Sequence, residues 1–139
     1  MIYSNIPQVM RQVDNSMKKL DVGARRARDE MAMTLTQLAK EEIKGKREPG
    51  EKATIGQPPK NRTGTLRRSI KAERIREGFA TYTALVGPTV VYGRSLEVGG
   101  KYAPPTWTED NKYPYMEPAF RKFKKVAHYI LRKHLLLGR

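Results

Sequence analysis

The sequence predicts an α+β fold with a long N-terminal helix, a small antiparallel sheet of three or four strands, and a C-terminal helix packed on that sheet. Three observations lead to this prediction. Apolar residues recur at helical spacing over residues 5–47, β-branched and aromatic residues follow a period of two within residues 66–98, and a second helical pattern covers residues 115–137. The length of 139 residues suits a single domain spanning residues 1–139.

The N-terminal helix is predicted from a stripe of apolar or small residues whose steps mostly alternate between four and three. Gly23 weakens the middle of this helix by about 1 kcal/mol relative to alanine, and Asp21 can cap a second helix there. The pattern therefore leaves open one helix over 5–47 or two helices with a break near Leu20–Gly23. The members of the stripe are Ile6, Met10, Val13, Met17, Leu20, Ala24, Ala27, Met31 and Leu38.

This apolar stripe has two interpretations. In the first, the stripe packs against the sheet of its own domain. In the second, an unbroken helix of about 40 residues, roughly 60 Å long, extends beyond a domain with a radius of gyration of about 14 Å, and the extension packs on a neighbouring subunit. Gly23 and Ala27 are interface candidates because small residues let another backbone approach closely.

The predicted sheet is a meander with short connections. Its first strand follows a turn at Leu66 and runs to about Arg76, and Glu77-Gly78 makes a tight turn into the second strand at Phe79–Val86. Thr89–Val98 is predicted to be a third strand, or a strand with a turn, closed by a double glycine.

Two predicted loops are rich in proline and glycine. Residues 45–62 (GKREPGEKATIGQPPKNR) have little to bury, and we expect this loop to be mobile in an isolated subunit and ordered by a partner. Residues 99–113 contain the only tryptophan, Trp107. A loop aromatic of this kind is either a local cap over the core or a contact anchor, and both alternatives stay open.

Charge is the dominant feature of the composition. The chain has 28 lysines and arginines against 14 aspartates and glutamates, which gives a formal net charge of +14. Such a chain attracts polyanions. The charge has three interpretations: a solvated basic surface that aids solubility, a face that docks on acidic protein neighbours, or a surface that attracts nucleic acid.

The sequence has no pattern typical of catalysis, of a metal site or of a cofactor site. There is no cysteine to act as a ligand or nucleophile. His128 and His134 stand six residues apart on one predicted helix, which places them on different faces, and the carboxylates are scattered. We therefore predict a protein that is not an enzyme and that needs no metal or cofactor.

Membrane association is also not predicted. No apolar stretch approaches the about 20 residues that cross a bilayer, and the first residues, MIYSNIPQVM, do not have the pattern of a signal peptide.

Glu97 is an unusual residue in an otherwise semi-apolar predicted strand, three residues after Arg94. It is either a solvent-facing charge that discourages pairing at a sheet edge or one half of an ion pair between subunits, with an arginine such as Arg67 or Arg68. These four residues and Trp107 complete the set of interface candidates.

The second half of the chain has three segments that contain glycine or proline at expected element boundaries, here called the punctuated segments. They are TGTLRRSI (Thr63–Ile70), VYGRSLEVGG (Val91–Gly100) and YPYMEPAF (Tyr113–Phe120). In this order and spacing they resemble the minor tail or tail-completion proteins of long-tailed bacteriophages, which act at the head–tail junction. The resemblance covers roughly residues 37–136, and the insert YAPPTWTEDNK departs from it. The residues on which the resemblance rests are Thr63, Gly64, Leu66, Ser69, Ile70, Tyr92, Glu97, Gly99, Tyr113, Pro114, Tyr115, Pro118 and Ala119.

The resemblance implies a structural virion protein without catalytic activity. Such a protein would form a homo-oligomeric ring of six copies in the neck, between head-closure or connector proteins and the tail terminator or tail tube, with DNA passing through the lumen. It would be located in the virion, and in the host cytoplasm during assembly. The motif residues would then be structural.

The main alternative function is a basic nucleic-acid-binding protein, whose affinity would fall steeply with salt. Against this alternative, the aromatic residues Phe79, Tyr82 and Tyr92 lack the glycine-flanked signature of RNA-binding sheets. A third alternative, a toxin or small hydrolase, needs a convergent catalytic site that the sequence does not show.

Overall fold

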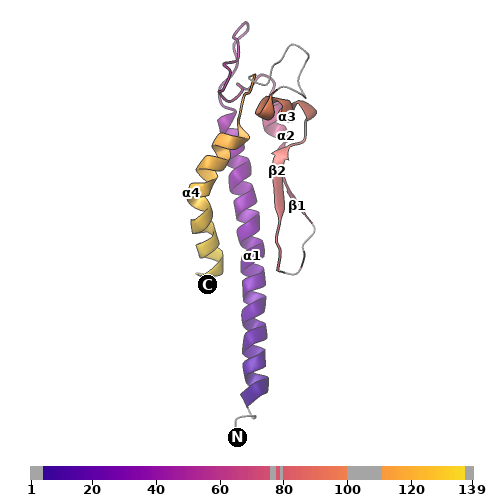
Figure 1. Ribbon diagram of the computed structural model, residues 1–139, viewed down its shortest axis with the longest axis vertical. Helices are drawn as coiled ribbons and strands as arrows, with labels where there is room; N and C mark the ends of the chain where they lie inside the picture. Colours follow the sequence, from indigo (N-terminus) through magenta and orange to yellow (C-terminus); the bar gives the residue numbers. More distant parts are fainter. Residues whose placement is uncertain (1–4, 76–77, 79, 100–110, 137–139) are drawn as a thin grey trace.

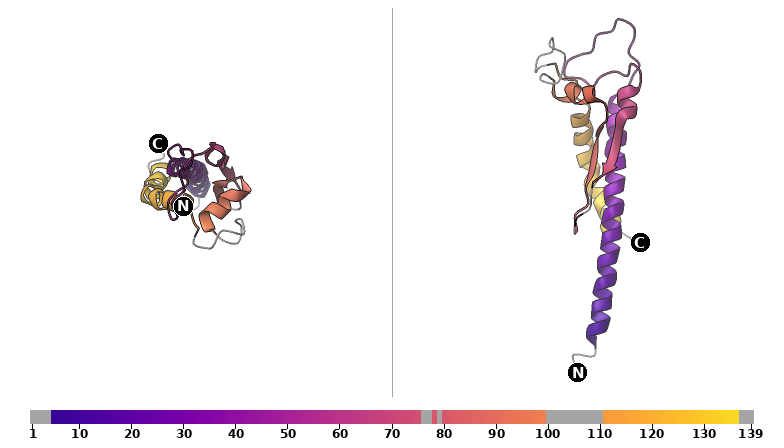
Figure 2. Two further views of the ribbon diagram at one scale, coloured as in Figure 1. Left: turned by 90° about the horizontal axis from the view of Figure 1, so that it is seen from above. Right: turned by 90° about the vertical axis from the view of Figure 1, so that its right-hand side faces the viewer.

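The structure is a computed structural model that describes residues 5–75, 78, 80–99 and 111–136. A long helix, α1, runs the length of the molecule, with α4 along one side of it and a β-hairpin along another (Figures 1 and 2). The elements in chain order are α1 (Ile6–Glu42), α2 (Thr65–Ser69), β1 (Ile70–Arg74), β2 (Ala84–Pro88), α3 (Val91–Val98) and α4 (Met116–Leu135).

The N-terminal helix is a single unbroken helix, so the break considered near Leu20–Gly23 does not occur. Gly23 is buried where α1 and α4 come close, and a Cβ there would lie 2.5 Å from the carbonyl oxygen of His134. The residue that lowers helix propensity thus lets two backbones approach, and packing offsets the lost propensity. The helix ends at Glu42, short of the predicted Arg47, because Ile43 leaves the helical conformation.

The sheet has two antiparallel strands among the described residues, fewer than the three or four predicted, with Ile70 opposite Pro88. The predicted third strand at Thr89–Val98 is wrong, because most of this segment is α3. The buried residues of α3 are Gly93 and Ser95, and a Cβ on Gly93 would lie 2.6 Å from Pro88. Close packing of small residues against the end of β2 therefore determines this segment, although its β-branched and aromatic residues suggested a strand.

The hairpin itself also differs from its prediction. The turn expected at Leu66 is the short helix α2, and β2 continues through Gly87 and Pro88, beyond the predicted end of the second strand at Val86. The predicted turn at Glu77-Gly78 lies partly outside the described residues. Gly78 forms an isolated antiparallel bridge with Thr81, close to where that turn was expected.

The C-terminal helix packs mainly on α1, and not on the sheet as the sequence suggested. A two-stranded hairpin offers little apolar surface, since four of the five residues of β1 are exposed. The first turn of α4 reaches the core, and further along Lys122 and Lys133 of α4 form ion pairs with Glu42 and Glu30 of α1. The core consists of Ala39, Ile43, Leu66, Ile70, Tyr115 and Ala119.

The loop over residues 45–62 folds back on itself. The amide of Arg47 donates to the carbonyl of Asn61 at 3.2 Å, and the amide of Asn61 donates to the carbonyl of Gly45 at 3.0 Å. Whether the loop is mobile in an isolated subunit stays a prediction. Most of the second predicted loop, including Trp107, lies outside the described residues. Over the described part of the chain, no helix is long and apolar enough to cross a membrane.

Candidate functional site

The three punctuated segments meet at the end of the molecule that lies away from the N-terminus (Figure 1). Leu66 and Ile70 of the first segment pack in the core with Tyr115 of the third. Ser69 is also buried, and its hydroxyl donates to the carbonyl of Leu66 at 2.7 Å. Segments that are separate in the sequence therefore form one junction.

Glu97 joins the second segment to the third. Its carboxylate accepts hydrogen bonds from three backbone amides at the start of α4: Tyr115 at 2.8 Å, Met116 at 3.0 Å and Glu117 at 2.9 Å. The first amides of a helix lack partners within the helix and carry a partial positive charge, and no side chain of Tyr115 caps this helix. Glu97 thus caps α4 from another helix, a role that neither interpretation of the sequence included.

Tyr115 makes the second link of the junction. Its ring is fully buried, and its hydroxyl donates to the carbonyl of Gly93 at 3.1 Å. Burial, and then the nearby charge of Glu97, raises the pKa of the Tyr115 hydroxyl. The hydroxyl therefore stays protonated and keeps donating. A Cβ on Gly93 would lie 3.0 Å from this hydroxyl, so the contact depends on glycine there.

The other motif residues form turns and connections. Gly64 and Gly99 have φ values of 76° and 69°, which glycine adopts without strain. Arg68 donates to the carbonyl of Thr63 at 3.1 Å, and the amide of Tyr113 donates to a carbonyl of α3 at 2.7 Å. Pro114 and Pro118 are half-buried, whereas Tyr92, Arg67 and Arg94 are exposed.

The close backbone approach expected at Gly23 and Ala27 occurs within the chain. Ala27 is 1 % exposed, and the carbonyl of His134 lies against Gly23. The small-residue patch on α1 is therefore occupied by α4 of the same molecule.

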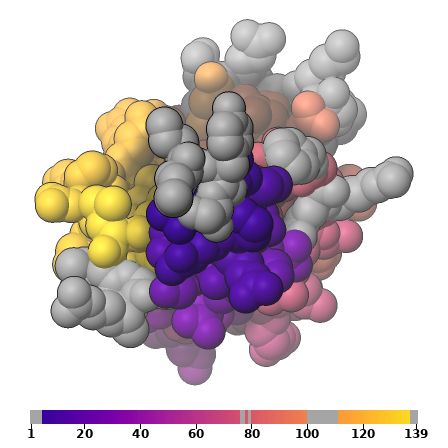
Figure 3. All heavy atoms as spheres, turned by 90° about the horizontal axis from the view of Figure 1, so that it is seen from below, coloured from indigo at the N-terminus to yellow at the C-terminus, as the bar shows by residue number. Residues whose placement is uncertain are grey.

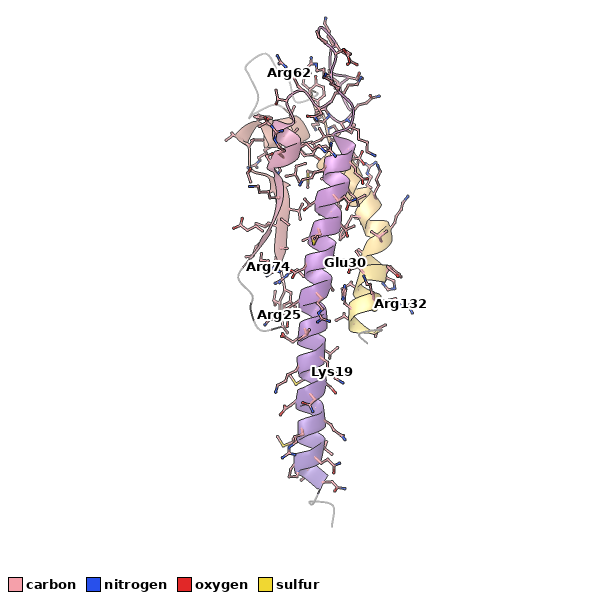
Figure 4. All side chains as sticks on the ribbon, turned by 180° about the vertical axis from the view of Figure 1, so that it is seen from behind. Lys19, Arg25, Glu30, Arg62, Arg74 and Arg132 are labelled. Atoms are coloured by element: carbon pink, nitrogen blue, oxygen red, sulfur yellow. The ribbon has the colours of Figure 1, made fainter. Side chains whose placement is uncertain are left out.

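Two adjacent acids of α1 hold the elements on either side of it. Asp29 accepts hydrogen bonds from the Nη2 and Nε atoms of Arg74 on β1, at 2.6 Å and 3.1 Å. Glu30 accepts from Lys133 of α4 at 2.9 Å and lies 2.5 Å from Nε2 of His134. Figure 4 shows Glu30 on the α4 side of α1 and Arg74 on the hairpin side.

These contacts shift the pKa of both carboxyls downward. Burial raises the pKa of Asp29, but hydrogen bonds from Arg28 and Arg74 outweigh that effect and hold it below the usual value. The hydrogen bond with His134, followed by that with Lys133, lowers the pKa of Glu30. Both acids are therefore ionised at neutral pH, and they link α1 to β1 and α4 through charged hydrogen bonds.

The packed part of the molecule ends near Asp21 and Gly23. Tyr82, near the tip of the hairpin, donates a hydrogen bond to Asp21, which also pairs with Arg25 at 3.1 Å. The C-terminal end of α4 stops level with Gly23.

Beyond that point, residues 6–20 of α1, here called the projecting segment, extend about 22 Å, and no other described element lies beside them (Figure 1). Every residue from 5 to 20 is exposed. Figure 3, which looks along α1 from its N-terminal side, shows this segment standing between the end of α4 and the hairpin. Its large apolar side chains are 47–62 % exposed: Ile6, Val9, Met10, Val13, Met17 and Leu20.

No group of three histidine, aspartate or glutamate side chains that could hold a metal ion occurs in the described part of the chain. His128 is exposed and His134 contacts Glu30.

Sequence reasoning missed the paired acids Asp29 and Glu30. A signal was present, because they interrupt the basic run from Arg25 to Arg28 with two negative charges on adjacent residues. Adjacent residues of a helix point about 100° apart, so two neighbouring acids can serve two different partners.

Comparison of the chain with protein-family models, with curated proteins and with solved structures finds no match.

Proposed function

We propose that this protein is a structural virion protein of a long-tailed bacteriophage, a tail-completion protein that forms a ring in the neck joining head and tail. The observation that carries the proposal is the projecting segment, a helix end with six large apolar side chains about half exposed. The resemblance of the three segments, which meet at one junction, supports the choice of family.

The projecting segment has the properties of a subunit contact. A helix of 15 residues is marginal by itself in water, and this one has no packing of its own. Full burial of one large aliphatic side chain stabilises by about 1.5–3 kcal/mol, so covering six half-exposed ones contributes on the order of 5 kcal/mol. An assembled ring would supply that cover.

The partner of the projecting segment, in this proposal, is a second copy of the chain. A second exposed apolar patch comes from α4 and the residue after it: Val126 and Tyr129 are 40 % and 67 % exposed, and Leu136 is 73 % exposed. A helix with a heptad stripe packs naturally on another such stripe. Because the two patches differ, their contact is heterologous, and heterologous contacts close into rings when the rotation allows. Six copies is the number that the family implies.

The net charge of +14 constrains such a ring. Identical basic subunits repel one another, so the ring needs anionic surroundings. Acidic surfaces of the head-closure proteins and of the tail terminator or tail tube would supply them, with DNA in the lumen. Moderate salt should therefore strengthen self-association, because it screens the repulsion while leaving the apolar contact intact.

The decisive experiment is electron microscopy of purified virions that carry this protein, combined with copy-number analysis. A ring of this chain at the head–tail junction is the expected result. Absence of the chain from that junction would reject the proposal.

Native mass spectrometry of the purified protein tests the contact itself. Val13→Asp should abolish self-association, because it puts a charge into the apolar stripe. Asn15→Asp adds the same charge two residues away, off that stripe, and should leave self-association intact. Equal behaviour of the two variants would show that the stripe is not the contact.

A further inference from the structure

We propose that the cleft between the loop 45–62 and helices α2 and α3 binds a single strand of nucleic acid, with phosphates on its cationic rim and unpaired bases against its tyrosines. The cleft lies at the opposite end of the molecule from the projecting segment, as the positions of Arg62 and Lys19 in Figure 4 show. This proposal does not depend on the proposed function, because it concerns a different surface and is tested on the isolated protein.

The cleft has the size of a binding site. Its volume is about 850 Å³, within the range of about 300–1,000 Å³ that is usual for ligand clefts. The loop 45–62 forms one wall, and the start of α2 together with α3 and Tyr113 forms the other. A cleft of this size admits the unpaired bases of a single strand, whereas a duplex can only lie across its mouth.

The rim of the cleft is strongly cationic. Arg47, Lys52, Lys60 and Arg62 line it, together with one acid, Glu51. Lys60 forms an ion pair with Glu51, and Arg47 donates to the backbone carbonyl of Glu51 at 2.7 Å. Lys52 and Arg62 pair with no acid among the described residues. Two cations are thus held in place by the loop, and two are available to a bound anion.

The cationic surface continues outside the cleft. Lys44 and Lys46 precede the cleft-lining part of the loop, and Arg67 and Arg68 lie in the last turn of the short helix α2. All four side chains are exposed. Exposed cations near the cleft add contacts for the repeated charge of a phosphodiester backbone, which gains affinity by releasing its counterions.

One wall of the cleft presents aromatic rings. Tyr92 of α3 is 47 % exposed, and Leu96 lies one helical turn further along. The backbone amide of Tyr113 donates to the carbonyl of Leu96 at 2.7 Å, which holds the second ring on the same wall. Bases stack on such rings without regard to sequence, and the hydroxyls of Thr54 and Thr63, which also line the cleft, can donate to phosphates.

An acidic peptide would meet the same cations, but the lining favours a nucleic acid. Interfaces with peptides are fixed by side chains that enter apolar pockets. The aliphatic residues at the base of this cleft, Ile43 and Leu66, are only 2 % and 9 % exposed, so these two offer little surface to the side chain of a peptide. The exposed ring of Tyr92 suits the flat face of a base.

The first test is fluorescence anisotropy of the full chain with a labelled oligothymidylate of about 12 nucleotides. The double variant Lys52→Gln, Arg62→Gln should bind at least about tenfold more weakly. It should also reduce the slope of log K against log salt by about 1.4, since each phosphate contact on a single strand contributes about 0.7. The matched control, Lys125→Gln with Arg132→Gln on the exposed face of α4, removes the same charge and should lose less than about threefold.

The second test separates stacking from charge. Tyr92→Ala should weaken oligothymidylate binding by about tenfold with the salt slope unchanged, whereas Tyr92→Phe keeps the ring and should bind as the parent protein does. Circular dichroism and native mass spectrometry verify that each variant keeps its fold and oligomeric state.

Three results would overturn the proposal. An equal loss of affinity in the α4 control would mean that binding follows net charge and not the cleft. Equal or tighter binding of a poly-glutamate peptide would identify an acidic peptide as the ligand. Tighter binding of a duplex of the same length would mean that unpaired bases do not contribute to binding.

Discussion

The two halves of α1 have the same apolar spacing and opposite surroundings. In the packed half, from Asp21 to Glu42, α4 and the hairpin lie against the helix, and Ala27 of the stripe and the nearby Ala39 are 1 % and 0 % exposed. In the projecting segment the same spacing places Ile6 and Met17 in the stripe, and they are 47 % and 55 % exposed.

The residues of the two halves differ in size, and this difference is instructive. Where the end of α4 lies against α1, the facing residues of α1 are small, Gly23 and Ala27, because the two backbones are close. Where nothing lies on α1, the stripe has isoleucine, valine, methionine and leucine. Spacing therefore identifies which face of a helix meets a partner, and residue size indicates how closely that partner approaches.

The largest expected effect comes from making one substitution in each region. Ile43→Ala, at the end of the packed half, should lower the free energy of unfolding by about 2–5 kcal/mol, because Ile43 is 2 % exposed in the core. Ile6→Ala in the projecting segment should change it by no more than about 0.5 kcal/mol. Urea denaturation of the dilute protein, followed by circular dichroism, measures both. A comparable loss in Ile6→Ala would show that the projecting segment is packed in the isolated chain.

A second pair of substitutions tests the close approach of the helices. In Gly23→Ala the new Cβ would lie 2.5 Å from the His134 carbonyl, a clash that costs about 1–3 kcal/mol and should leave the variant less stable. This cost exceeds the gain in helix propensity, about 1 kcal/mol. Ser16→Ala, seven residues earlier on the same face, has only the small propensity gain and should be neutral or slightly stabilising. Thermal unfolding of the two variants gives the comparison, and a stabilised Gly23→Ala protein would contradict the packing described here.

The two long helices could be predicted because their periodicity extends over many residues, and local spacing is enough to identify such a helix. The packing of α4 on α1 could not be predicted, because it depends on contact between Gly23 and the backbone of His134, which is distant in the sequence. The helix α3 was mistaken for a strand because its composition favours strands, while close contact of Gly93 with Pro88 determines its conformation.

The candidate site also has features that the sequence predicts and features that it does not. The three segments could be recognised as turns and element boundaries from their glycines and prolines. The cap that Glu97 places on α4 could not be foreseen, because its partners are backbone amides, which have no signature in a sequence. Burial of Glu97's partner Tyr115 likewise depends on residues from all three segments.

The junction at the far end of the packed half should respond to loss of this cap. Glu97→Gln removes the negative charge that faces three amides of α4 and should lower the free energy of unfolding by about 1–2 kcal/mol. Glu73→Gln, on an exposed position of β1, is the matched control and should be neutral. Urea denaturation measures both, and equal stability of the two variants would mean that the cap contributes nothing to the fold.

The smallest expected effect is a pH dependence confined to the packed half. Asp29 and Glu30 have pKa values held below their ordinary values of 3.8 and 4.5. The unfolded chain therefore binds protons at a higher pH than the folded one, so these groups stabilise the fold above about pH 4.5 and lose that contribution as the pH falls through their folded pKa values. Both acids are partly exposed to solvent, which screens their ion pairs, so each contributes below about 1 kcal/mol. The difference in stability between the parent protein and Glu30→Gln should accordingly shrink between pH 6 and pH 3 in urea titrations, because the parent carboxyl becomes neutral like the amide. A difference that stays constant over this range would show that Glu30 acts through packing, and that charge does not fasten α4 to the packed half.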